Sequence, residues 1–171
     1  MYRRWFVALS VATYALVLAG LVRARPSPAG APGDCIAGGF PPVWNGMTLK
    51  AHTAGDAALA ALDSHHGRPL QLAGAQMARY EGEDADLTVW VAVAGDPGEA
   101  WDLVDRMTRK ISSAAGRLGP PVALHLGDLV IHKAIGGEWQ HFYYVRGDRV
   151  YWLAIRSPEA DRLALEAARA F

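Results

Sequence analysis

Residues 122–156 have the sequence VALHLGDLVIHKAIGGEWQHFYYVRGDRVYWLAIR, in which three glycine-containing pairs separate four short apolar runs. The pairs are Gly127-Asp128, Gly136-Gly137 and Gly147-Asp148. Glycine at the first central position suits a two-residue hairpin loop, and the runs are rich in β-branched and aromatic residues. This stretch therefore predicts consecutive antiparallel strands at 122–126, 129–135, 138–146 and 149–156.

Loops of two residues also predict the register of these strands. Loops at 147–148, 136–137 and 127–128 give the opposed pairs Tyr143–Trp152, His132–His141 and His125–Val130. Because side chains alternate along a strand, one face collects histidine and aromatic residues: His125, Val130, His132, Ala134, Trp139, His141, Tyr143, Trp152 and Ala154. The other face is more apolar and is predicted to face the core: Leu124, Leu129, Ile131, Ile135, Phe142, Tyr144, Tyr151, Leu153 and Ile155.

Helices are predicted on both sides of this stretch. Asp96 as N-cap, Pro97 at the first helical position and Glu99 in a capping-box pattern begin a helix that extends to about residue 115. A terminal helix follows Ser157-Pro158, and a looser helix begins at Asp56. With further strands at 76–80 and 87–94, the fold class is α+β: a mainly antiparallel twisted sheet of about 5–6 strands with two to three packed helices.

An uncharged N-terminal segment precedes this domain. Residues 5–22 (WFVALSVATYALVLAGLV) would span about 27 Å as a helix, close to the thickness of a bilayer's hydrocarbon core. The predicted organisation is an N-terminal signal anchor or signal peptide at 1–22, a Pro/Gly/Ala-rich linker at 23–42 and one soluble domain at 43–171.

Two fates of the N-terminal segment are open. The apolar run is long for a cleaved signal, and Pro32 follows the A-x-A triplet at 29–31, which favours a retained anchor. The paired Arg3-Arg4 fits positive-inside anchoring and partly resembles a twin-arginine signal. We expect a single-pass protein of the cell membrane with its domain outside the cytoplasm, or a secreted or periplasmic protein after cleavage.

Composition argues against several functional classes. Lys+Arg and Asp+Glu both number 17, and without a basic stripe we expect no nucleic-acid binding. The single cysteine, Cys35, excludes an intramolecular disulfide and leaves either a free thiol or an intermolecular bridge. No nucleophile stands at a recognisable spacing from a base, so the sequence does not point to an enzyme.

The histidine and aromatic face is the candidate site. Exposed aromatic clusters mark interaction surfaces, which makes Trp139, Tyr143 and Trp152 candidate residues for a ligand or partner. Nitrogen ligands suit zinc or copper, which makes His125, His132 and His141 candidate metal ligands. The third interpretation is structural: a helix or the linker covers this face.

Two functional hypotheses follow from these patterns. The first is a membrane-tethered extracytoplasmic accessory or binding domain that contacts a small ligand or a partner, such as a membrane protein complex, through the aromatic and histidine face. The alternative is a periplasmic metal- or haem-associated protein that uses the histidine cluster.

Overall fold

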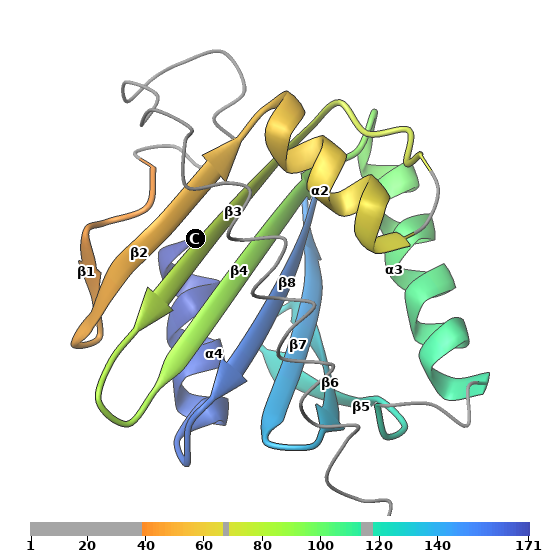
Figure 1. Ribbon diagram of the computed structural model, residues 1–171. Coiled ribbons are helices and arrows are strands. Elements are labelled where there is room, and N and C mark those ends of the chain that lie inside the picture. Colours follow the sequence, from red (N-terminus) through yellow and green to blue (C-terminus); the bar gives the residue numbers. More distant parts are fainter. Residues whose placement is uncertain (1–38, 67–68, 114–117) are drawn as a thin grey trace, which may run out of the picture.

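An eight-stranded antiparallel sheet forms the centre of the computed structural model, which describes residues 39–66, 69–113 and 118–171 (Figure 1). The strands lie in the order β1-β2-β3-β4-β8-β7-β6-β5. Their bounds are β1 (Val43–Trp44), β2 (Met47–Ala54), β3 (Gly74–Glu81), β4 (Asp86–Val93), β5 (Val122–Leu126), β6 (Leu129–Gly136), β7 (Trp139–Arg146) and β8 (Arg149–Arg156). The predicted α+β class with a mainly antiparallel sheet is confirmed.

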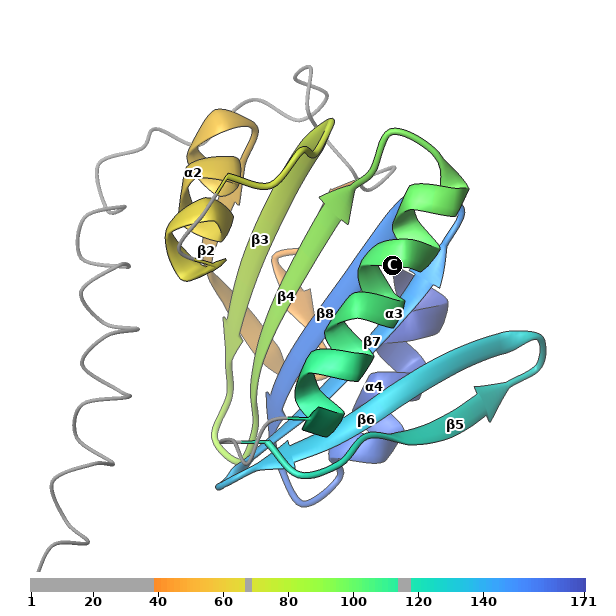
Figure 2. The same cartoon turned by 90° about the vertical axis from the view of Figure 1, so that its right-hand side faces the viewer.

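Three described helices cover the two faces of the sheet unequally (Figures 1 and 2). Helix α4 (Ala160–Ala170) lies against β8 on one face. Helix α2 (Asp56–His66) lies over β2 and β3 on the opposite face, and α3 (Pro97–Ser113) lies over β7 and β8 on that same face. The larger core is therefore on the α4 side, and two smaller clusters lie beneath α2 and α3.

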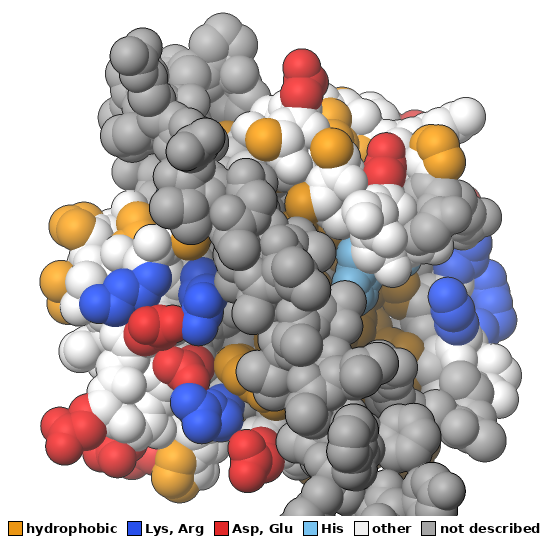
Figure 3. Space-filling model, in the orientation of Figure 1, with side chains coloured by type: hydrophobic (Ala, Val, Ile, Leu, Met, Phe, Trp, Pro, Cys, Tyr) orange, Lys and Arg blue, Asp and Glu red, His pale blue; other side chains and the backbone are white. Residues whose placement is uncertain are grey.

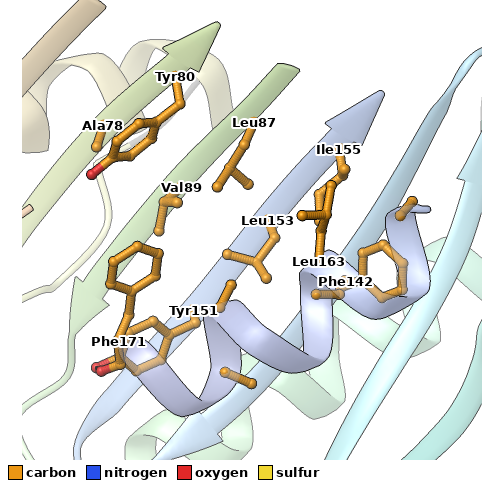
Figure 4. Close-up of a cluster of buried hydrophobic side chains, with 14 of the residues drawn as sticks. Ala78, Tyr80, Leu87, Val89, Phe142, Tyr151, Leu153, Ile155, Leu163 and Phe171 are labelled. Carbon is orange, nitrogen blue, oxygen red and sulfur yellow. The ribbon is translucent and has the colours of Figure 1, made fainter. Parts of the chain in front are cut away.

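The α4 side is the core face predicted from the alternation of side chains. Ile131, Phe142, Tyr144, Tyr151, Leu153 and Ile155 are all buried there against the apolar stripe of α4 (Figure 4). The Tyr151 hydroxyl donates a hydrogen bond of 3.0 Å to the Phe171 carbonyl, which fixes the end of the chain to the sheet. Ile135 is the exception: it is 54% exposed, because it lies beside the hairpin loop at the end of β6.

Two strands were missing from the sequence prediction of about 5–6 strands. Strands β1 and β2 form a hairpin whose loop is Asn45-Gly46, with φ of 49° and 76° at the two residues. Asn-Gly is the preferred pair for a type I′ turn, so the signal was present. Strand β2 itself (MTLKAHTA) has few β-branched residues, which explains why its composition did not reveal it.

Helix α3 begins as its sequence predicts. The backbone N–H of Glu99 donates to Asp96 Oδ1 at 2.9 Å, which makes Asp96 the N-cap. The Glu99 carboxylate reaches back and accepts from the N–H of Gly95 at 2.9 Å. The first bond satisfies a backbone donor that the first turn of a helix would otherwise leave free, and the second holds the backbone just ahead of the N-cap.

The three hairpin loops each have glycine at the first central position, with φ of 59° at Gly127, 65° at Gly137 and 61° at Gly147. Two loops lie where predicted, with Leu126 opposite Leu129 and Arg146 opposite Arg149. The middle loop was predicted wrongly: Gly136 pairs with Trp139, so the loop is Gly137-Glu138. The observed register between β6 and β7 therefore differs from the predicted one by two residues. A shift of two residues keeps every side chain on its predicted face.

The position of this loop can be tested with two matched substitutions. A Cβ at Gly137 would meet no atom within 4 Å, so Gly137→Ala adds only the strain of a left-handed φ. We expect a loss of about 1–2 kcal/mol of unfolding free energy. Gly136 has no left-handed φ, and Gly136→Ala is expected to cost less than about 0.5 kcal/mol. Urea denaturation of the two variants measures the difference; the reverse order would contradict the observed register.

Candidate functional site

Four rings lie in one row across the α2/α3 face of the sheet. His132, Tyr143, Trp152 and Trp90 are successive cross-strand partners on β6, β7, β8 and β4. His132 stacks on Tyr143 with ring centroids 5.0 Å apart, and Tyr143 stacks on Trp152 at 5.1 Å. Direct opposition in the sheet brings these side chains together, since cross-strand neighbours are about 5 Å apart.

Helix α3 covers part of this row. Tyr143 is fully buried under it, and the Thr108 hydroxyl of α3 lies 3.1 Å from the Tyr143 hydroxyl. Burial raises the pKa of Tyr143, so its hydroxyl stays protonated and hydrogen-bonded at neutral pH. Tyr143, which the sequence predicted as a ligand or partner residue, is thus buried under a packed helix and is not part of the exposed surface of this face.

The centre of the face lies between the helices and is only half covered. We define the aromatic recess as Thr88 and Trp90 of β4, His141 of β7, and Trp152 and Ala154 of β8, all of them half-buried. Trp90 lies opposite Trp152, and Ala154 has Thr88 on one side and His141 on the other. His141 and Trp152 also touch, with ring centroids 5.5 Å apart. Figure 3 shows hydrophobic side chains in a hollow beside α2.

One end of the recess has a charged rim. The guanidinium of Arg156 lies 5.9 Å from the ring centroid of Trp139, and its Nε donates to Asp86 Oδ2 at 3.0 Å. Arg79 lies opposite Thr88 and forms an ion pair with Glu81. A cavity of about 330 Å³ continues the rim outward and is lined by Glu83, Asp84, Glu138, Arg156, Ser157 and Pro158. The rim offers both signs of charge.

The recess itself carries no charge at neutral pH. Burial lowers the pKa of His141 to about 4, and burial also lowers the pKa of His132. Both imidazoles are therefore neutral at pH 7. His141 Nδ1 is buried and has no hydrogen-bond partner within the described part of the chain. A buried polar atom without a partner costs about 1–3 kcal/mol of folding free energy, so Nδ1 lowers the stability of the domain as it stands.

The predicted metal centre is not formed. His132 lies opposite Tyr143 and His141 lies opposite Ala134, so the two imidazoles are not the directly opposed pair that the sequence predicted. His125 is exposed on β5, opposite Val130. Across residues 39–66, 69–113 and 118–171, no group of three or more His, Cys, Asp or Glu side chains could hold a metal ion. The cause is the position of the β6–β7 loop, which is one residue later than predicted. The resulting register places Tyr143, and not His141, opposite His132.

Sequence reasoning missed the two recess residues of β4. His141, Trp152 and Ala154 lie half-buried on the predicted face, but Trp90 and Thr88 were not among the candidates. They reach the site because β4 pairs with β8, which places Trp90 beside a residue far away along the chain. The apolar run at 87–94 predicts a central strand but carries no signal for its neighbour, because strand order depends on the whole fold.

The predicted anchor at 1–22 and most of the linker at 23–42 lie outside the described residues. None of the described helices is long and apolar enough to cross a membrane. The tether and the location of the domain therefore stay predictions.

Comparisons of this chain with protein-family models, with curated proteins and with solved structures found no match.

Proposed function

We propose that this chain is a membrane-tethered binding domain, held outside the cytoplasm by its N-terminal segment, whose aromatic recess takes an apolar segment of a partner protein. One observation carries the proposal: Trp90 and Trp152 are opposed cross-strand residues at the centre of an eight-stranded sheet and remain half-buried, although helices cover the sheet on either side of them. Indoles in such a central position would be expected to be fully covered, unless a partner completes the packing.

The surroundings of the recess favour a protein as the partner. Protein interfaces combine an uncharged aromatic centre with a polar rim, and tryptophan is enriched at their most important positions. The recess contains one neutral histidine, His141, and the Arg156–Asp86 and Arg79–Glu81 ion pairs lie at its end.

Support for the tether comes from sequence alone. Residues 5–22 carry no charge and are long enough for one membrane crossing, with Arg3 and Arg4 before them. A tethered domain meets partners in the same membrane at high local concentration. Because of this high local concentration, a small contact surface such as the recess would be sufficient to bind a partner in a membrane complex.

Site-specific photocrosslinking on the full chain in its native membrane tests the proposal. A photoreactive residue at Thr88, in the recess, is expected to give one crosslinked product of defined mass, and the second substitution Trp152→Ala should reduce its yield at least about tenfold. The same photoreactive residue at Trp101, which is 50% exposed on α3, serves as the control and should not give that product.

The possible outcomes separate the candidate partners. Equal products from the two positions, or a product unaffected by Trp152→Ala, would refute the recess as the contact site. Native mass spectrometry of the purified full chain gives the second readout. A bound small molecule that Trp152→Ala releases would replace the protein partner with a small ligand at the same place.

A further inference from the structure

We infer that strand β5 is a self-association edge, through which two copies of this chain pair antiparallel about a two-fold axis at Leu124. β5 is the last strand at its end of the sheet (Figure 2). This inference is independent of the aromatic recess, so each can fail without the other.

The edge lacks the features that usually prevent strand pairing. Soluble proteins protect edge strands with charged residues, internal proline, bulges or very short strands. The sequence of β5 is VALHL, without charge or proline, and it pairs with β6 in an unbroken register. Val122 is 56% exposed, and Ala123 and His125 are exposed as well. At the opposite end, by contrast, β1 has only two residues.

Hairpin geometry gives the free backbone groups. In a two-residue hairpin the residues that flank the loop bond to each other, here Leu126 and Leu129. Alternation then directs the N–H and C=O groups of Leu124 toward β6, and those of Ala123 and His125 away from it. No described residue hydrogen-bonds to these outward groups, so the outer edge of β5 offers two residues with available donors and acceptors to an incoming strand.

A second copy of β5 fits this pattern of groups. An antiparallel pair centred on Leu124 places Ala123 opposite His125 of the other copy, so the outward groups of both residues bond to each other. It also places Val122 next to the partner's Leu126, which extends the apolar α4-side surface across the axis. The formal net charge of zero adds no long-range repulsion between copies. The arrangement is isologous, as a closed dimer requires.

Substitutions at Ala123 test the hydrogen bonds without touching β6. Ala123→Pro removes one outward N–H from each copy, while Ala123→Val keeps it. Sedimentation velocity of the full chain in mild detergent is expected to show a concentration-dependent dimer. Ala123→Pro should weaken it at least about tenfold, because the lost bond occurs twice, whereas Ala123→Val should leave it unchanged. Circular dichroism confirms that both variants are folded.

Disulfide trapping tests the position of the axis. With Cys35→Ser to remove the other thiol, Leu124→Cys places two thiols on the axis, where Cα atoms about 4.5 Å apart permit a disulfide. His125→Cys is the matched control, since each copy faces Ala123 and its thiols are diagonal neighbours about 7–8 Å apart. We expect Leu124→Cys to form dimers under mild oxidation several-fold faster. The inference would be overturned by a chain that stays monomeric at all concentrations, or by a dimer that Ala123→Pro does not weaken. Equal rates of disulfide formation for Leu124→Cys and His125→Cys would also overturn it.

Discussion

Ile155→Ala is expected to destabilise the domain by about 2–5 kcal/mol, the usual cost of truncating a large buried aliphatic side chain. Ile155 is fully buried on the α4 side of β8, where it lies opposite Leu87 of the neighbouring strand β4. Its truncation leaves a cavity between the central strands and α4 that close-packed neighbours cannot fill. Urea denaturation of the full chain, followed by circular dichroism, measures the loss.

Ile135→Ala is the matched control for this prediction. The residue is also an isoleucine on a strand and belongs to the same predicted face, but it is 54% exposed. Its truncation removes little buried area, and we expect a cost below about 1 kcal/mol. Similar losses for the two variants would mean that the α4-side core is not centred on β8 as described here.

Acidification from pH 6.5 to pH 4 is expected to lower the unfolding free energy by about 3 kcal/mol through His141. Burial lowers its folded-state pKa to about 4, whereas an unfolded chain titrates near the ordinary value of 6.5. The unfolded state therefore binds the proton first as the pH falls. The stabilising contribution is complete above pH 6.5, and it is lost progressively down to pH 4. His132 contributes in the same direction, because burial lowers its pKa as well.

The comparison of two glutamine variants isolates this effect from the titration of carboxylates. His141→Gln should flatten the dependence of stability on pH between 6.5 and 4, even if the variant is less stable at every pH. His125→Gln, on the exposed edge strand, should leave the slope as in the parent chain. Urea denaturation at four pH values across the window gives the slopes. Parallel curves for His141→Gln and the parent would disprove the burial of His141.

The loops and faces of the C-terminal hairpins were predictable because they depend on neighbours in sequence. Glycine with a positive φ marks each turn, and the alternation of side chains separates Tyr151 and Leu153 from Trp152. Even the wrong loop at Gly136-Gly137 kept the faces, since a shift of two residues preserves a period of two. The pairing of His132 with His141 did not survive, because opposition across strands requires the exact register.

Burial on the α2/α3 face was not predictable from any local pattern. Tyr143 and Trp152 lie opposite each other on adjacent strands and on the same face of the sheet, yet α3 buries the first and leaves the second half-buried. The difference depends on where a helix from residues 97–113 comes to rest on the sheet. The amphipathic pattern of that helix predicts that it packs, but not against which strands.

The sequence by itself determined the α+β class, the capped α3 helix, the four C-terminal strands and the face of each of their side chains, because these follow from backbone conformations and periodicities within a few residues. Only the tertiary structure decided that β4 lies beside β8, that α3 covers Tyr143, and that Trp90 and Trp152 lie opposite each other and half-buried. Those contacts join residues distant along the chain, and they are selected by the packing of the whole domain rather than by any segment of it.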